Sequence, residues 1–297
     1  MPPRASLCGL LNIHKPEGWT SREVVNHVQK LVRPAKAGHA GTLDPLATGV
    51  LVVCVGPATR LINFVQASTK RYRGRFRLGL TSDTEDISGA LTELPGAELV
   101  TRDSIESLLP GLTGQILQRP PAFSALHVDG QRAYELARKG KTVELDPRPV
   151  RIDRLILTEF SPPDFVLEIT CGAGTYVRSV GRDLGAQLGC GAVMTALVRE
   201  AVGSFAVSTA INPEHLDRDQ LIANLIPARQ AVDHLPTTTI SDDEIVALRQ
   251  GKSLSGQHIP TGPAGTMLAL LNATGELVAV AELTAEGRCQ PRIVLAT

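Results

Sequence analysis

The sequence predicts a mixed α/β fold for residues 7–232, followed by a small all-β region at residues 233–297. Apolar residues recur at helical spacing from residue 24 to residue 32, whereas residues 50–55 form a continuous apolar run typical of a buried strand. The last part of the chain holds one short helix followed by three short β-like runs. With 297 residues, the chain is long enough for one large domain and one small domain.

The predicted elements follow from periodicity and from Gly and Pro punctuation. A Thr20-Ser21-Arg22-Glu23 capping box begins the first helix, and Pro34 ends it. We expect residues 81–89 to form a capped turn and residues 119–126 an extended, exposed loop. Further helices are expected at residues 58–66, 104–109, 131–139 and 242–251, and another is expected to open at residues 172–178 and run towards Leu188. Strands are expected at residues 10–13, 50–55, 70–78, 114–118, 150–160, 165–171, 194–202, 266–271, 277–283 and 291–295.

The composition restricts the class of protein but does not indicate a particular function. Thirty basic and thirty acidic side chains cancel, so only the distribution of charge can indicate a polyanionic partner. The five cysteines form no C-x-x-C pair, which favours a reducing cytoplasm and indicates no metal site. No signal peptide or membrane span is expected. The acidic segment 81–89 fails as a calcium loop because Ile87 and Leu94 stand at ligand positions.

The most informative stretch is Gly38-His39-Ala40-Gly41-Thr42-Leu43-Asp44-Pro45-Leu46-Ala47-Thr48-Gly49, a loop directly before a buried strand. Pro45 favours extended backbone at Asp44. A single carboxylate on a stiff loop at the end of a strand is typical of a functional site. The structural alternative is an aspartate that only caps its own turn.

A basic strand is the second informative stretch. Strict alternation over residues 70–78 places Arg71, Arg73, Arg75 and Arg77 on one face, with Tyr72 on the other. The structural alternative is a solvated face, or one paired with acids of a neighbouring strand. Because residues 60–80 contain no acid, the pattern favours a surface that faces phosphates, with Tyr72 free to enter a pocket.

The third stretch, Gly172-Ala173-Gly174-Thr175-Tyr176-Val177-Arg178, opens a helix. It lacks the third glycine of a dinucleotide fingerprint and the Lys of a P-loop, so nucleotide-cofactor binding is not indicated. Arg178 lies in the first helical turn, where the macrodipole disfavours a cation. An anionic partner explains its position better than helix stability does.

Taken in order, these motifs resemble those of the TruB family of bacterial tRNA pseudouridine-55 synthases, over essentially the full chain. Lys15-Pro16-Glu17-Gly18, Lys70-Arg71-Tyr72-Arg73 and Leu197-x-Arg199 complete the resemblance. It implies a pseudouridine-synthase fold, with an RNA-gripping, thumb-like insertion at residues 119–146 and a PUA-like domain at residues 233–297. The departures are His14, where the family usually has Asp, Val198-Arg199-Glu200, where many members have Arg-Arg, and an acidic C-terminal region.

The resemblance also implies residue roles. Asp44 would be the essential carboxylate, Arg178 its partner and Tyr72 the ring that stacks on the target base. His39 would contact RNA, Tyr176 and Leu197 would line the uracil pocket, and Lys15, Arg71 and Arg73 would bind substrate. No cofactor, metal, membrane or obligate protein partner is implied, and we expect a cytoplasmic monomer.

The function implied is isomerisation of uridine 55 in the T arm of tRNA, by flipping the base into the pocket. The alternative is a tRNA-binding folding assistant in which chemistry is secondary. An acid-base hydrolase is weaker, because no second carboxylate accompanies Asp44 in the motif. The residues leave open whether Asp44 attacks C6 of the base or C1′ of the ribose.

Overall fold

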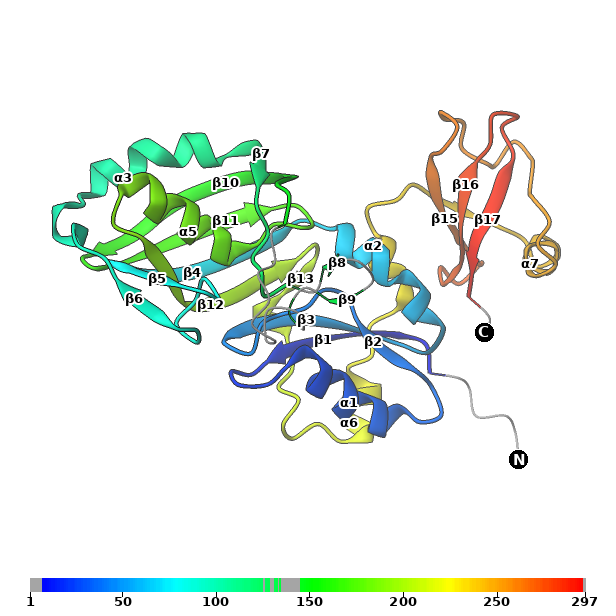
Figure 1. Cartoon of the computed structure of the whole chain (residues 1–297). Helices are drawn as coiled ribbons and strands as arrows, with labels where there is room; N and C mark the ends of the chain where they lie inside the picture. The colour runs from blue at the N-terminus through cyan, green and yellow to red at the C-terminus, as the bar shows by residue number, and fades with distance from the viewer. Residues whose placement is uncertain (1–6, 125, 129–130, 133, 135–144, 296–297) are drawn as a thin grey trace.

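A computed structural model describes residues 7–124, 126–128, 131–132, 134 and 145–295. The predicted mixed α/β fold is confirmed. In Figure 1, a large sheet with helices on its sides occupies the left and centre, and a small C-terminal sheet lies apart at the right. None of the helices in the described ranges is long and apolar enough to span a bilayer.

The large sheet brings the predicted functional strands together at its centre. Its main path runs β1-β3-β12-β4-β11-β10-β7, with β2 paired to β3 and β13 to β12. β3 and β12 are parallel, and the other neighbours are antiparallel. The strands are β1 (Gly9–Lys15), β2 (Ala37–His39), β3 (Ala47–Val55), β4 (Lys70–Leu78), β7 (Gly114–Gln118), β10 (Arg148–Ser161), β11 (Asp164–Cys171), β12 (Ala192–Val202) and β13 (Phe205–Ala206).

Helices cover the two halves of the sheet separately. α1 (Ser21–Val32) starts at the predicted capping box of Thr20 and Glu23 and packs with α6 (Arg218–Ala223) against β1 and β3. α3 (Arg102–Leu108) and α5 (Val177–Leu188) pack against β4, β10, β11 and β12. Each half therefore has its own apolar core, and α5 begins where the two halves meet (Figure 1).

Shorter elements connect these units. The predicted helix at residues 58–66 is a 3₁₀ turn, η1 (Gly56–Leu61), that continues into α2 (Ile62–Ala67). The remaining 3₁₀ turns are η2 (Ala97–Leu99), η3 (Leu109–Leu112), η4 (Val207–Thr209) and η5 (Ala228–Val232). Two small hairpins pair β5 (Leu80–Ser82) with β6 (Leu91–Glu93), and β8 (His127–Val128) with β9 (Gln131–Arg132).

The C-terminal sheet is ordered β14-β15-β16-β17, and α7 (Asp242–Arg249) lies between its first two strands along the chain. Its strands are β14 (Thr237–Thr239), β15 (Met267–Leu271), β16 (Leu277–Leu283) and β17 (Cys289–Val294). Leu271 and Val280 of this sheet share one buried apolar cluster with Leu10 and Leu61 of the larger region. The two parts are therefore packed together, although the boundary at residues 232 and 233 stays a prediction.

Residues 119–139 were predicted to form an exposed loop followed by a helix. The segment before residue 125 was expected to be exposed, which is wrong: Pro120, Pro121 and Ser124 are buried. The reason is that Arg178 and Arg182 of α5 donate hydrogen bonds to main-chain carbonyls of this segment. Most of the helix expected at residues 131–139, and much of the insertion expected at 119–146, lie outside the described residues.

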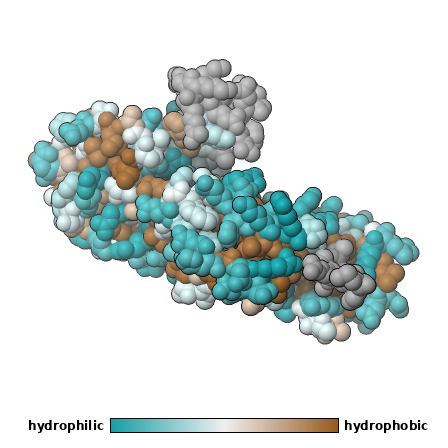
Figure 2. All heavy atoms as spheres, turned by 90° about the horizontal axis from the view of Figure 1, so that it is seen from below, coloured by the Kyte–Doolittle hydropathy of each residue, from teal (hydrophilic) through white to brown (hydrophobic). Residues whose placement is uncertain are grey.

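Charged and polar side chains cover most of the molecular face in Figure 2, with apolar side chains showing between them. The predicted turn at residues 81–89 is confirmed as a hydrogen-bonded turn, in which the Asp86 carboxylate accepts from Thr84 Oγ1 at 2.7 Å and Ser88 N at 2.9 Å. Of its three acids, Asp83 is exposed, whereas Glu85 and Asp86 are buried and pair with arginines of α5.

Candidate active site

The loop that carries Asp44 is held by its own carbonyl groups. We call residues 41–45 the aspartate loop. Arg199, on β12, donates from Nη2 to Gly41 O at 3.0 Å and from Nη1 to Thr42 O at 3.4 Å. Its Nε donates to Val50 O at 2.6 Å, and the side chain is only 2% exposed. One buried guanidinium therefore fixes both the start of the loop and the strand that follows it.

The rest of the aspartate loop has equally definite partners. Ser21 Oγ donates to Leu43 O at 3.0 Å and accepts from Leu43 N at 2.8 Å. Asp44 O accepts from Ala47 N at 3.0 Å. Pro45 O accepts from Gly18 N at 2.9 Å and from Lys15 Nζ at 3.2 Å. Because all five carbonyls are satisfied, the loop is stiff before any ligand binds.

Gly49, just after this loop, must be a glycine. Its φ is +99°, and a Cβ there would lie 2.3 Å from Arg199 O. The backbones of β3 and β12 are therefore in close contact beside Asp44, which a side chain would prevent.

Asp44 and Arg178 form the predicted ion pair. Arg178 Nε lies 2.9 Å from Asp44 Oδ2, and the remaining guanidinium nitrogens donate to Thr84 O at 2.6 Å and Phe123 O at 2.9 Å. The Arg178 side chain is 7% exposed, whereas that of Asp44 is 38% exposed. Arg178 is thus committed to the protein, and it presents a carboxylate that a ligand can still reach.

Tyr72 lies beside this pair. Burial raises the pKa of Tyr72 above its ordinary value; the Arg199 guanidinium, which also donates to the phenol oxygen, opposes the rise, and the Asp44 carboxylate adds to it. Tyr72 lies opposite Arg199 in the pairing of β4 with β12, and Leu197 lies opposite Gly74. Tyr72 and Leu197 belong to one apolar cluster with Leu43 of the aspartate loop.

Tyr176 completes the group at the start of α5. Its main chain exchanges two hydrogen bonds with the Gln118 side chain, of 2.9 and 3.1 Å. Burial raises the pKa of Tyr176, Arg178 lowers it, and the Asp44 carboxylate contributes to the rise. Arg178 thus pairs directly with Asp44, the Asp44 charge acts on both Tyr72 and Tyr176, and Leu197 packs in the apolar cluster of Tyr72. That these five residues form one site stays a prediction.

His39 and Lys15 are the last residues of β2 and β1, two strands that both pair with β3. His39 ends β2, opposite Val53 of β3; burial lowers its pKa, and Arg22 and Arg199 lower it further. Lys15 is fully buried, and its ammonium group donates to the carbonyls of Pro16, Trp19 and Pro45. Burial lowers the pKa of Lys15 to about 8. In this arrangement Lys15 supports the loop, and its direct contact with substrate stays a prediction.

The basic strand alternates as predicted, but its arginines have counter-charges. Arg73 and Arg75 pair with Glu159 of β10, and Arg77 makes a two-bond pair of 2.9 Å with Asp164 of β11. The alternative of pairing with acids of neighbouring strands therefore holds for these three. Among the residues that the structure describes, no ion pair involves Arg71, which is exposed.

Sequence reasoning passed over several residues that shape this site. Arg199 was noted only as part of a motif, Ser21 only as part of a capping box, and Asp86, 3.9 Å from Arg178, only as part of a turn. A usable signal existed for Arg199, because a charge inside an apolar strand needs buried partners. Nothing local identifies the role of Ser21.

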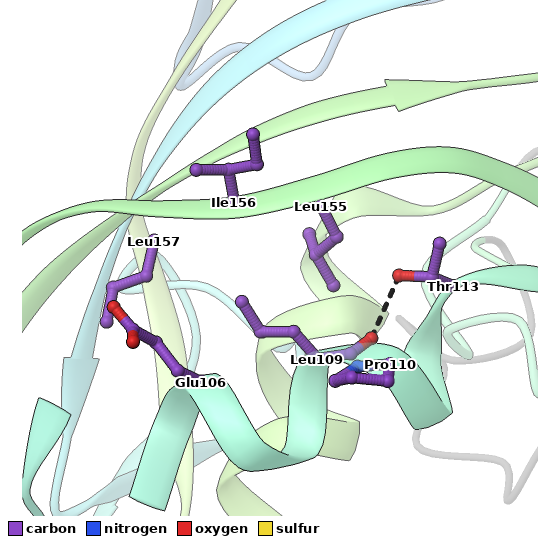
Figure 3. A pocket seen from close by; sticks show the side chains of 7 residues that line it. All are labelled: Glu106, Leu109, Pro110, Thr113, Leu155, Ile156 and Leu157. Atoms are coloured by element: carbon purple, nitrogen blue, oxygen red, sulfur yellow. Dashed lines mark hydrogen bonds between the residues drawn. The ribbon is translucent and has the colours of Figure 1, made fainter. Parts of the chain in front are cut away.

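A separate cavity of about 400 Å³ lies between α3, η3 and β10 (Figure 3). Leu109, Leu155 and Leu157 line it, Glu106 stands at its edge, and Thr113 Oγ1 donates to Leu109 O at 2.9 Å. None of the predicted site residues contributes to it. Within the described residues, no group of three or more His, Cys, Asp or Glu side chains could hold a metal ion.

Comparison with known proteins agrees with this geometry. The family model of the TruB family pseudouridylate synthase N-terminal domain matches residues 29–177. A tRNA pseudouridine synthase B of Solibacter usitatus is 37% identical, covering 97% of this chain and 99% of the relative. A protein of the same name from Dehalococcoides mccartyi is 39% identical, covering 94% and 90%.

Solved structures show the same fold. A chain of an H/ACA ribonucleoprotein bound to a substrate RNA containing 2′-deoxyuridine matches with a TM-score of 0.74 at 25% identity, covering 97% of this chain and 85% of that one. A chain of a Cbf5-Nop10-Gar1 complex matches with the same TM-score at 27% identity. The fold and these relatives together define a pseudouridine synthase, an isomerase that acts on RNA. Within that class, the chain belongs to the TruB family.

Proposed function

We propose that this protein isomerises uridine 55 in the T arm of tRNA to pseudouridine, with Asp44 as the essential carboxylate. The observation that carries the proposal is the Asp44–Arg178 ion pair, held on a fully hydrogen-bonded loop beside Tyr72. Relatives that match nearly the whole chain are named tRNA pseudouridine synthase B, which supports tRNA as the substrate.

The reaction breaks the N1–C1′ bond of uridine, turns the uracil and forms a C5–C1′ bond. C5 loses its proton and N1 gains one, so the reaction consumes no electrons and no water. Asp44 is the single carboxylate that faces the reacting nucleoside in this proposal. Arg178 keeps the Asp44 carboxylate aimed and compensates for its partial burial, which costs free energy for an unpaired charge.

The target base has to leave the T loop to reach Asp44. Flipping a base costs a few kcal/mol, and stacking on an aromatic ring returns about 1–3 kcal/mol. Tyr72 provides that ring from β4, and Tyr176 and Leu197 line the uracil pocket. The apolar neighbours Leu43 and Val177 help to keep water away from the detached uracil until the new bond forms.

RNA binding outside the pocket is proposed for His39, Arg71 and Arg73. Of these, Arg71 is best placed for a phosphate, because Arg73 already pairs with Glu159. The protein is proposed to act in the cytoplasm as a monomer, without an obligate protein partner. A tRNA-folding role without chemistry would not require an ion-paired acid on so constrained a loop.

Tritium release from C5-labelled uridine in a T-arm transcript tests the proposal. The wild-type protein should release tritium, and Asp44→Asn should release none above background while still binding the transcript. A matched transcript with cytidine at position 55 should release none with either protein. Equal release by wild type and Asp44→Asn would refute the role of Asp44, and no release by the wild type would refute the enzyme proposal.

A further inference from the structure

The segment 84–86 lies against the guanidinium group of Arg178. Thr84 O accepts a hydrogen bond from Arg178 Nη1 at 2.6 Å, and Asp86 Oδ2 lies 3.9 Å from Arg178 Nε. The same Nε lies 2.9 Å from Asp44. The direction in which Arg178 presents its guanidinium to Asp44 therefore depends on where this segment lies.

Glu85, between these two contacts, ties the segment to α5. Its carboxylate accepts a hydrogen bond from Ser179 Oγ at 2.6 Å and pairs with Arg182 Nη1. Ser179 follows Arg178 directly, and Arg182 lies one helical turn further on. Glu85 thus connects segment 84–86 to the same helical turn that carries Arg178.

The backbone at Glu85 is also unusual. It is the only residue other than glycine with a positive φ among the described residues, at +64°. Such a conformation costs free energy and persists only where the surroundings fix it. The main chain is fixed by β12, because Met194 N donates to Glu85 O at 3.2 Å and Ile87 N donates to Met194 O at 3.0 Å.

Arg182 also pairs with a second acid, Asp183. A substitution at Asp183 can therefore separate a structural role of Glu85 from a positioning role. Asp183 Oδ1 accepts from Arg182 Nε at 2.9 Å and lies 2.8 Å from Arg182 Nη2. Asp183 shares the arginine with Glu85 but, in the described part of the chain, makes no hydrogen bond or ion pair with segment 84–86 or Arg178. Loss of Asp183 therefore perturbs the same ion-pair cluster and leaves the support of Arg178 intact.

We propose that Glu85 is a positioning residue for the isomerisation: its contacts with Ser179 and Arg182 hold segment 84–86 against Arg178 and thereby aim Asp44. This inference rests on the proposed function. Glu85 is 8% exposed, so it acts through Arg178 and not through contact with RNA.

Glu85→Gln tests this role with little change in volume. The neutral amide cannot serve both donors as the carboxylate does, so segment 84–86 loosens and Arg178 loses its fixed direction. We expect the single-turnover rate of pseudouridine formation to fall about tenfold or more, while the Kd for a T-arm transcript changes less than about twofold. A merely structural role would change unfolding without this split between rate and affinity.

Asp183→Asn is the matched control and should keep the wild-type rate. Ser179→Ala removes one donor to Glu85 with minimal loss of packing, and should lower the rate about two- to fivefold at unchanged Kd. If thermal unfolding shows that Glu85→Gln does not fold, the rate of Ser179→Ala tests the proposal in its place.

The outcomes separate the two proposals. A wild-type protein that forms no pseudouridine overturns the proposed function. An active wild type with an equally fast Glu85→Gln, or equal rate losses in Glu85→Gln and Asp183→Asn, overturns the inference alone. An unchanged rate in Ser179→Ala overturns it where Glu85→Gln does not fold.

Discussion

Two sets of cations in this protein are used in opposite ways. Lys15, Arg178 and Arg199 are nearly or fully buried around the aspartate loop, and they donate mainly to backbone carbonyls. Arg73 and Arg77, on the outer face of β4, are about half exposed and pair with the side-chain carboxylates of β10 and β11.

The difference shows that charge density along a sequence is a poor guide to where charge organises a structure. The exposed arginines occupy alternate positions of one short stretch and are easy to notice, yet ion pairs of this kind contribute about 0–1 kcal/mol. The buried cations occur singly in apolar surroundings. Each satisfies several carbonyl groups that would otherwise cost about 1–3 kcal/mol apiece to bury.

The largest effect is expected from Arg199→Met. The substitution leaves the carbonyls of Gly41, Thr42 and Val50 without a donor, so we expect the free energy of unfolding to fall by about 3–5 kcal/mol. Urea unfolding measures the change. Arg77→Met, from the exposed set, is the control and should cost less than about 1 kcal/mol. Similar losses for both variants would remove the distinction between the two sets.

A smaller effect, dependent on pH, is expected for Lys15. Its pKa is lowered to about 8 in the folded protein, so between pH 8 and the value of about 10.4 for an unperturbed lysine the unfolded chain binds more protons. Stability from this group therefore rises with pH through that window, as the cost of a buried charge is relieved. The unfolding free energy of wild type should gain about 1–3 kcal/mol relative to Lys15→Met between pH 7 and pH 10.4.

Urea unfolding of both proteins at the two pH values measures this gain. Lys70, whose pKa burial also lowers to about 8, is present in both proteins, so its contribution cancels. A difference between wild type and Lys15→Met that stays constant or shrinks with rising pH would contradict the assignment.

The smallest effect concerns RNA affinity. Arg71→Ala should reduce the slope of log K against log salt by about one and weaken T-arm binding a few-fold, because one phosphate contact is lost. Arg73→Ala should change the slope by less than half as much, since Glu159 already neutralises Arg73. Filter binding over a range of salt concentrations measures both slopes. Equal changes would show that the Glu159 pair does not shield the strand.

The fold was predictable wherever a local pattern carries it. The helix at residues 21–32 follows from its capping box and apolar spacing, and the strand at 70–78 follows from its strict alternation. β14 was missed, because Thr237–Thr239 has no apolar alternation and forms a strand only as the parallel partner of β15. The burial of residues 120–124 was missed because the covering arginines lie more than 50 residues away in sequence.

The residues of the candidate site also fall into two groups, those with a local sequence signature and those without one. Asp44 could be found from its loop, and Arg178 from its unfavourable place in a helical turn, because each has a local signature. The partners that fix them have none: Arg199 reaches Val50 across 149 positions, and Glu85 reaches Ser179 across 94. Such contacts exist only once the sheet has brought β12, α5 and segment 84–86 together.

The apolar cluster that joins the small C-terminal sheet to the larger region has a consequence for how this chain can be shortened. Leu271 and Val280 belong to the same buried cluster as Leu10 and Leu61, and Arg60 donates to Val294 O at 2.7 Å. Truncation near residue 232 would expose the apolar side chains of this cluster that belong to the larger region, among them Leu10 and Leu61. Deletion of residues 233–297 alone should therefore give a protein that aggregates. A shortened enzyme would need polar substitutions at the exposed apolar positions.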